Sequence, residues 1–169
     1  RDSGGTSREQ GYQVGVNKST DEIYVVGFTW SADFPIGALA GNTTHQPAKS
    51  GFEDAFIIKL DANGQRIWST FYGGNNNSQG TGVTVDNAGN LLISGLTRAT
   101  TGIATAGSAQ TAFGGAGASF GDGFAAKFNS TGTRQWGTYL GGSSDDYASE
   151  ITADNAGNVF VLSLIHISE

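Results

Sequence analysis

Short runs of apolar and β-branched residues, separated by turns rich in glycine and asparagine, recur along the chain. In the middle of the chain the runs predict four strands: Thr81–Val85, Leu91–Thr97, Gly123–Phe128 and Arg134–Leu140. The preceding part has four corresponding runs: Tyr12–Val16, Ile23–Thr29, Ala55–Leu60 and Arg66–Tyr72. No stretch keeps the 3.6-residue spacing of an amphipathic helix over three turns. The pattern therefore predicts an all-β fold.

The two sets of runs are copies of one unit. Trp68 and Trp136 are 68 positions apart, and the same offset relates the turn Asp86–Asn90 to the identical turn Asp154–Asn158. A repeat of this kind indicates structural units that bury their faces against one another. Eight positions share the repeat and are expected to have structural roles: Asp54, Lys59, Trp68, Asp86, Asp122, Lys127, Trp136 and Asp154.

The strands are apolar on both faces, as Ile23 and Val25 lie opposite Tyr24 and Val26 on one run. Sheets covered on both faces by copies of themselves favour blades stacked around an axis. We expect a β-propeller fragment with about two four-stranded antiparallel blades and the start of a third. A β-solenoid has much shorter coils, and a sandwich would not explain the strict 68-residue repeat.

The repeat divides the chain into five segments. Residues 1–10 are expected to end a preceding repeat, 11–74 to form the first blade, 75–142 the second and 143–161 the start of a third. After Val161 the repeat predicts a Ser-Gly-Leu-Thr step, but the chain reads Leu-Ser-Leu-Ile-His-Ile-Ser-Glu. We interpret residues 162–169 as a non-native tail translated from a sequencing adapter, with a divergent strand as the alternative.

Composition narrows the functional classes. The net charge is −6, and the nine basic residues are scattered singly, which argues against nucleic-acid binding. No run approaches the roughly 20 apolar residues of a membrane helix, so membrane insertion is not expected. The absence of cysteine removes disulfides and thiolate metal sites.

Three segments of the first copy are similar to the SBBP repeat, named for a seven-bladed β-propeller: Gly27–Pro35, Asp54–Leu60 and Trp68–Gly74. The second copy departs from the pattern after Thr97, where Arg98 to Ile103 replace its Ser-x-Asp-Phe-Pro segment. The resemblance implies large, mostly bacterial proteins that are extracellular or attached to the cell surface. It implies no known reaction.

Residues 30–53 and 98–121 form two loops of 24 residues that differ in sequence. Loops of this length are commonly functional. Trp30, Asp33 and His45 in the first loop are the candidate binding residues, although an exposed, unpaired loop histidine is the simpler interpretation of His45.

The repeated side chains also allow functional interpretations. Asp54, Lys59 and their copies could form charged rings around a channel, but contacts to loop amides and between blades are the expected role. Trp68 and Trp136 could stack on sugars, but packing between blades is expected. Asp86–Asn90 and its copy could contribute to calcium binding, but turn chemistry explains each residue. No catalytic residue, metal ligand or cofactor is assigned.

We therefore expect a non-catalytic scaffold or binding platform for protein or carbohydrate, whose blades also contact neighbouring blades. One alternative is part of a hydrolase or lyase with an active site formed by other blades, and another is a structural spacer. Open blade faces are expected to make the isolated chain poorly stable or self-associating.

Overall fold

The computed structural model describes residues 4–115 and 121–164, and within them the chain is all-β, as expected. The strands of the first part are β1 (Glu9–Asn17), β2 (Glu22–Thr29), β3 (Gly37–Ala38), β4 (Asp54–Leu60) and β5 (Arg66–Tyr72). They are followed by β6 (Ser78–Val85), β7 (Leu91–Thr97), β8 (Asp122–Phe128), β9 (Arg134–Leu140), β10 (Tyr147–Ala153) and β11 (Val159–Leu164). None of the described residues belongs to a helix that could cross a membrane.

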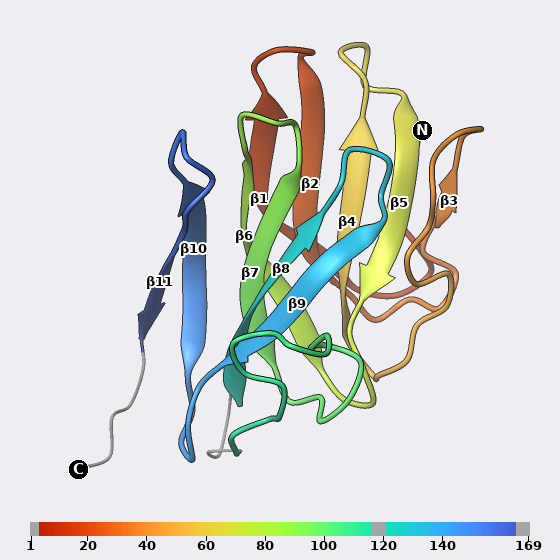
Figure 1. Ribbon diagram of the computed structural model, residues 1–169. Helices are drawn as coiled ribbons and strands as arrows, with labels where there is room; N and C mark the ends of the chain where they lie inside the picture. The colour runs from red at the N-terminus through yellow and green to blue at the C-terminus, as the bar shows by residue number, and fades with distance from the viewer. Residues whose placement is uncertain (1–3, 116–120, 165–169) are drawn as a thin grey trace.

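The strands form three separate antiparallel sheets (Figure 1). Sheet 2 has the order β6-β7-β8-β9, and sheet 3 consists of β10 and β11. Sheet 1 has the order β1-β2-β4-β5-β3 and thus contains one strand more than the four expected. The additional strand arises because the first long loop turns back along β5, where Gly37 pairs with Ser69 and Ala38 with Trp68.

The sheets are arranged like successive propeller blades. The first strand of each sheet lies beside the first strand of the next, in the order β1, β6 and β10 (Figure 1). None of the sheets closes on itself. The long loops leave β2 and β7 at the same end of these sheets, so both loops and the connections between sheets lie at one end of the stack.

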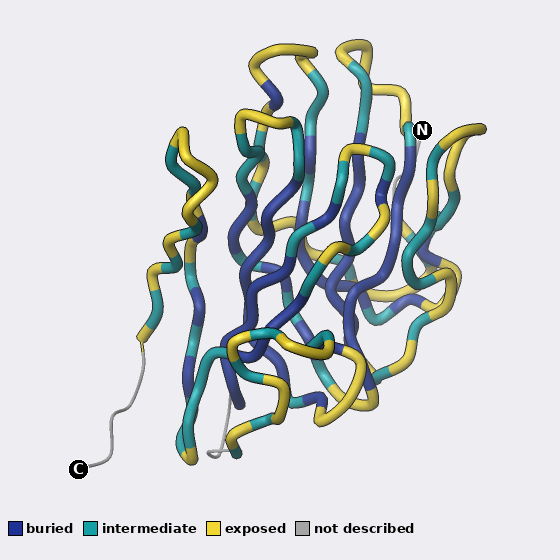
Figure 2. Tube along the Cα trace, in the orientation of Figure 1, coloured by how far each residue is buried: buried dark blue, intermediate teal, exposed yellow. Residues whose placement is uncertain are grey.

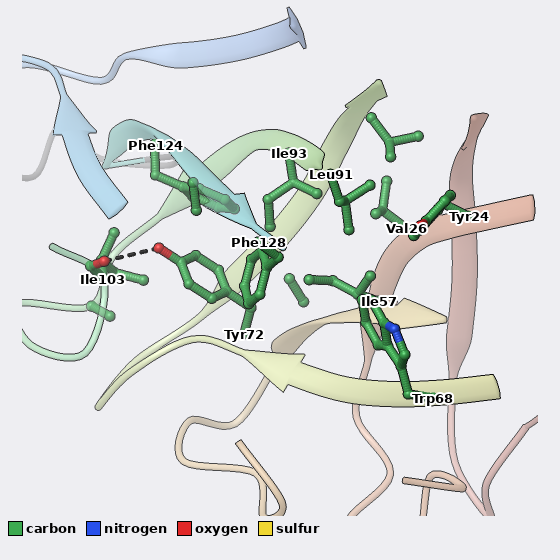
Figure 3. Close-up of a cluster of buried hydrophobic side chains, with 14 of the residues drawn as sticks. Tyr24, Val26, Ile57, Trp68, Tyr72, Leu91, Ile93, Ile103, Phe124 and Phe128 are labelled. Carbon is green, nitrogen blue, oxygen red and sulfur yellow. Dashed lines mark hydrogen bonds between the residues drawn. The ribbon is translucent and has the colours of Figure 1, made fainter. Parts of the chain in front are cut away.

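Apolar side chains fill the spaces between the sheets. The cluster between sheets 1 and 2 includes Tyr24, Ile57 and Trp68 from one sheet and Ile93 and Phe128 from the other (Figure 3). A second cluster packs sheet 2 against sheet 3 through Leu92, Ala125 and Ile151. Consequently, the central strands are buried while their turns remain exposed (Figure 2).

In sheets 1 and 2 a β-bulge in the first strand lies opposite a glycine of the neighbouring strand, whereas the corresponding bulge in sheet 3 lies opposite Ser163. The register of β1 with β2 shifts between Gly11 and Gln13, and the register of β6 with β7 shifts between Gly80 and Gly82. A Cβ atom on Gly27 would lie 1.9 Å from the carbonyl oxygen of Gln10. The bulge thus explains why glycine occupies this central strand position.

Part of the proposed non-native tail is paired in the structure. Leu162 pairs with Glu150, Ser163 with Ala148 and Leu164 with Tyr147, so these residues extend β11. The alternation of leucine and serine suits a strand whatever the origin of the segment, because pairing depends mainly on backbone hydrogen bonds. Residues 165–169 lie outside the described residues.

Candidate functional site

The repeated aspartates at the start of β4 and β8 hold the long loops against their sheets. Asp54 is fully buried and accepts hydrogen bonds from the backbone N–H groups of Ser50 (2.8 Å) and Gly51 (3.0 Å). Asp122 accepts one from Gly114 N (2.7 Å) through Oδ2. Burial raises the pKa of both carboxyl groups, although these hydrogen bonds oppose the shift.

Two glutamines that do not share the 68-residue spacing complete this arrangement. Gln46 donates from Nε2 to Asp54 Oδ2 (2.8 Å), and its Oε1 accepts from Gly73 N (3.0 Å). Gln110 contacts Asp122 Oδ2 (3.4 Å) and Gly141 N (3.1 Å) in the same way.

The glutamines precede their aspartates by eight and twelve positions, so the 68-residue offset does not align them. Both loops contain a Gln-x-Ala tripeptide, and this was the sequence feature from which the two glutamines could have been matched. In each loop the glutamine Nε2 also donates to the alanine carbonyl oxygen, from Gln46 to Ala48 and from Gln110 to Ala112. Loops of different sequence are therefore tied down by the same contacts.

The repeated lysines and tryptophans lie in or beside the interfaces between sheets. Lys59 Nζ forms an ion pair with Glu22 (2.9 Å) and donates to Ser130 O of the next sheet (3.0 Å). Trp68 is fully buried and donates from Nε1 to the same Ser130 carbonyl (3.2 Å). Trp136 is half-buried against the cluster between sheets 2 and 3.

Lys127 pairs with Asp86 at 2.8 Å and links β8 to the turn after β6. Asp86 Oδ1 also accepts from the N–H groups of Ala88 and Asn90. Burial alone would raise the pKa of Asp86, but the hydrogen bonds from Lys127 and Asn90 outweigh it and lower the pKa.

The copy of this turn follows β10. Asp154 Oδ1 accepts from Ala156 N and Asn158 N, and the bonds from Asn158 lower its pKa. Both carboxylates thus cap their own turns. Among the described residues, no group of three or more histidine, aspartate or glutamate side chains is placed to hold a metal ion.

The three binding candidates of the first long loop lie against different partners. Asp33 is exposed and accepts from the backbone and hydroxyl groups of Thr6. His45 is half-buried between sheets, with ring centroids 6.1 Å from Tyr72 and 5.6 Å from Phe128. The interpretation of His45 as an exposed loop histidine is therefore wrong, because the loop folds back between β5 of sheet 1 and β8 of sheet 2.

The environment of His45 keeps its imidazole neutral at pH 7. Burial, with a smaller contribution from the Arg134 charge, lowers the pKa of His45 to about 4. An open cavity of about 460 Å³ lies beside it, lined by His45, Arg134 and the backbone around Gly73 and Gly102. Arg134 already donates to the carbonyls of Gly102 (2.8 Å) and Ile103 (3.2 Å), which fixes its guanidinium group in the wall.

Trp30 belongs to a continuous row of four aromatic side chains at the end of the stack where the loops lie. The centroid distances are 5.7 Å from Tyr12 to Phe28, 6.4 Å from Phe28 to Trp30 and 5.3 Å from Trp30 to Phe52. We call this row the aromatic ladder: Tyr12, Phe28, Trp30 and Phe52. It runs from β1 to the end of the first long loop.

Hydrogen bonds fix the ladder on the side that faces the sheets. Trp30 Nε1 donates to Glu53 Oε2 (2.6 Å), and Gln79 Nε2 of the next sheet donates to Glu53 Oε1 (2.6 Å). Gln79 Oε1 in turn contacts the Tyr12 hydroxyl (3.3 Å). Glu53 is only 5 % exposed, so its charge is directed inward.

The outer side of the ladder is accessible. Phe52 is 66 % exposed and Tyr12 is 43 % exposed, whereas Phe28 is buried and Trp30 is half-buried. The ladder thus presents an aromatic surface on a hydrogen-bonded base. Such a surface can bind another molecule by ring contact. The sequence alone did not reveal Tyr12, Phe28 and Phe52 as members of the ladder, nor Gln79 as a residue that supports it.

Comparison with known proteins agrees with this architecture. No curated protein matches the chain. Residues 135–164, which include β9, β10 and β11, match the family described as the SBBP β-propeller repeat. Residues 135–164 thus match an SBBP repeat, and the three open antiparallel sheets are consistent with part of a β-propeller.

Proposed function

We propose that this protein is a non-catalytic carbohydrate-binding module, in which propeller blades support the aromatic ladder as the contact surface. The observation that carries the proposal is the exposed ring of Phe52, which packs on a Trp30 whose indole N–H is bonded to Glu53. Aromatic faces are electron-rich and suit the C–H groups of a sugar ring.

The rigidity of the ladder supports a binding role. Trp30 is held by Glu53, and Glu53 is held by Gln79 from the neighbouring sheet. A surface ordered before binding loses less side-chain entropy when a ligand arrives. Protein is the other ligand class that fits an exposed aromatic surface, and it is an outcome of the test.

The non-catalytic part of the proposal rests on the use of Glu53. Both of its carboxylate oxygens accept hydrogen bonds from side chains of the ladder and of sheet 2. This suits a carboxylate that positions Trp30 rather than one that transfers protons. An extracellular or cell-surface location, in which polysaccharides are accessible, belongs to the same proposal.

The test is binding of the protein to an array of immobilised polysaccharides, with Phe52→Ala as the variant. Leu39→Ala is the matched control, because Leu39 is also an exposed apolar residue of the same loop but lies outside the ladder. We expect Phe52→Ala to lose binding and Leu39→Ala to retain it.

Equal binding by the wild type and Phe52→Ala would contradict the proposal. Binding to protein arrays alone would assign the ladder to a protein ligand. No binding in either format, with loops that tolerate replacement, would favour a structural spacer.

A further inference from the structure

We infer that the carbohydrate bound by the aromatic ladder is an anionic polysaccharide, whose acidic groups contact Arg8 and Lys49. This inference rests on the proposed function and deepens it. It starts from the two cations placed on the ladder. The Arg8 guanidinium carbon lies 5.2 Å from the Trp30 ring centroid, and Lys49 Nζ lies 5.6 Å from that of Phe52.

These two cations differ from most other basic side chains of this acidic chain. Lys59 and Lys127 form ion pairs with acidic residues, and Arg66 and Arg134 donate to backbone carbonyls. The charges of Lys59 and Lys127 are therefore compensated within the fold, while Arg66 and Arg134 are held at carbonyls away from the aromatic ladder. Arg8 and Lys49 instead lie beside the exposed aromatic surface, where a ligand would meet them.

Arg8 retains the capacity to bind an anion. Its side chain is exposed, and within the described residues it makes one side-chain hydrogen bond, from Nη2 to Gln10 Oε1 at 3.1 Å. A guanidinium group has five N–H donors in a planar fork that matches a carboxylate or sulfate. Contact with the faces of Phe28 and Trp30 keeps this fork at the ladder.

Lys49 occupies the other end of the ladder. Its Nζ donates to the carbonyl oxygen of Phe52, which places the ammonium group beside the most exposed ring. An ammonium group has three donors, so two protons remain beyond this bond.

The two acidic groups that directly adjoin Trp30 and Phe52 in the chain or in space lie beneath the accessible side of the ladder. Glu53 is nearly buried, and both of its oxygens accept hydrogen bonds from Trp30 and Gln79. Asp54 is fully buried under loop amides. A ligand therefore meets aromatic rings and cations first. A polymer with an acidic group on its sugar rings provides both a C–H face for Phe52 and anions for Arg8 and Lys49.

The experiment measures affinity for polygalacturonate, for its neutral methyl ester and for a sulfated dextran. We expect the two anionic polymers to bind and the methyl ester to bind at least about tenfold more weakly, with a further loss as salt is added. The arms separate carboxylate from sulfate as the source of the anion. Binding of either polymer supports the inference.

The variants are Arg8→Gln and Lys49→Gln, with Lys18→Gln as the control because Lys18 is exposed in the turn between β1 and β2. Arg8→Gln and Lys49→Gln are each expected to lose about threefold to tenfold affinity for the anionic polymer. The control should bind like the wild type, and unchanged thermal melting of all variants shows that they fold.

Failure of this inference is distinguishable from failure of the proposed function. Equal binding of polygalacturonate and its methyl ester, with loss in Phe52→Ala, would overturn the anionic preference and leave the carbohydrate site. Binding of both polymers that Phe52→Ala does not change would overturn the site itself. Absence of binding to all of the polymers would overturn the inference.

Discussion

Asp54 and Asp122 occupy the same place in two consecutive sheets, but their carboxylates are satisfied to different extents. Both oxygens of Asp54 accept hydrogen bonds from backbone N–H groups of its loop. In Asp122 this role falls to Oδ2, while Oδ1 is buried without a hydrogen-bond partner in the structure as described. The nearby Asp146 charge further raises the pKa of Asp122.

The difference predicts opposite effects for one substitution. Asp54→Asn should lower the free energy of unfolding by about 1–3 kcal/mol, because the new NH₂ group would face an N–H donor. Asp122→Asn should be neutral or stabilising at pH 7, because its NH₂ group can replace the unpartnered Oδ1 and removes the repulsion from Asp146. Chemical denaturation of both variants measures these changes.

The pH dependence gives a further check on Asp122. A carboxyl group whose pKa is raised by folding costs stability as pH rises from its unfolded value through the folded one. Any advantage of Asp122→Asn should therefore be largest at neutral pH and decrease in acid. A loss of stability in Asp122→Asn equal to that in Asp54→Asn would contradict this interpretation.

The sequence predicted the repeated aspartates but not the glutamines that bind them. Asp54 and Asp122 begin strands, so their spacing is set by the regular frame. Gln46 and Gln110 belong to loops whose paths differ in length before they reach the same place. A fixed offset cannot identify such pairs, because it compares positions along the chain rather than contacts.

Among the elements, the bulged first strands make the strictest demand on sequence. A Cβ atom on Gly95 would lie 2.0 Å from the carbonyl oxygen of Gln79 and 2.6 Å from the Phe124 ring. The backbone on one side and a fully buried ring on the other cannot both move away. The recurrence of glycine at this position thus has a steric cause.

Gly95→Ala is therefore expected to lower the free energy of unfolding by more than about 3 kcal/mol or to prevent folding. Gly142→Ala is the matched control, because a Cβ atom there would meet no atom within 4 Å. It should change stability by no more than about 0.5 kcal/mol. Thermal denaturation followed by circular dichroism compares the two variants, and equal stabilities would contradict the steric argument.

The whole stack exposes apolar side chains on its two outermost sheets. Val14 and Val16 are exposed on β1, and Phe160, Leu162 and Leu164 are exposed on β11. On β11 the alternate residues Val159 and Val161 pack against sheet 2, so the exposed set lies on the opposite face. Comparable faces between sheets are covered by a neighbouring sheet.

We therefore predict that the 169-residue polypeptide self-associates in solution through these faces. Sedimentation velocity over a range of concentrations should show association, and Phe160→Lys combined with Val14→Lys should weaken it. Leu39→Lys, at an exposed position outside both strand faces, is the control. A wild-type protein that remains monomeric at all concentrations would contradict the prediction.

The all-β class, the antiparallel sheets and the repeat could be predicted from the chain because they depend on local alternation and on turn residues of fixed type. Every strand expected in the first two units has a counterpart within one or two residues, apart from slightly longer β1 and β6. Glycine in the turns, as at Gly64 and Gly132, marks positive φ angles that other residues adopt less easily. Gly27 and Gly95 instead mark places where the neighbouring backbone comes too close for a side chain.

Contacts across the fold decided the remainder. The pairing of β3 with β5, the burial of His45 between sheets and the row from Tyr12 to Phe52 each join residues from different elements. No periodic pattern encodes such contacts, because a long loop follows the surface that the packed sheets offer it. The strands were therefore visible in the order of the residues, whereas the candidate binding surface existed only once the loop had folded onto the blades.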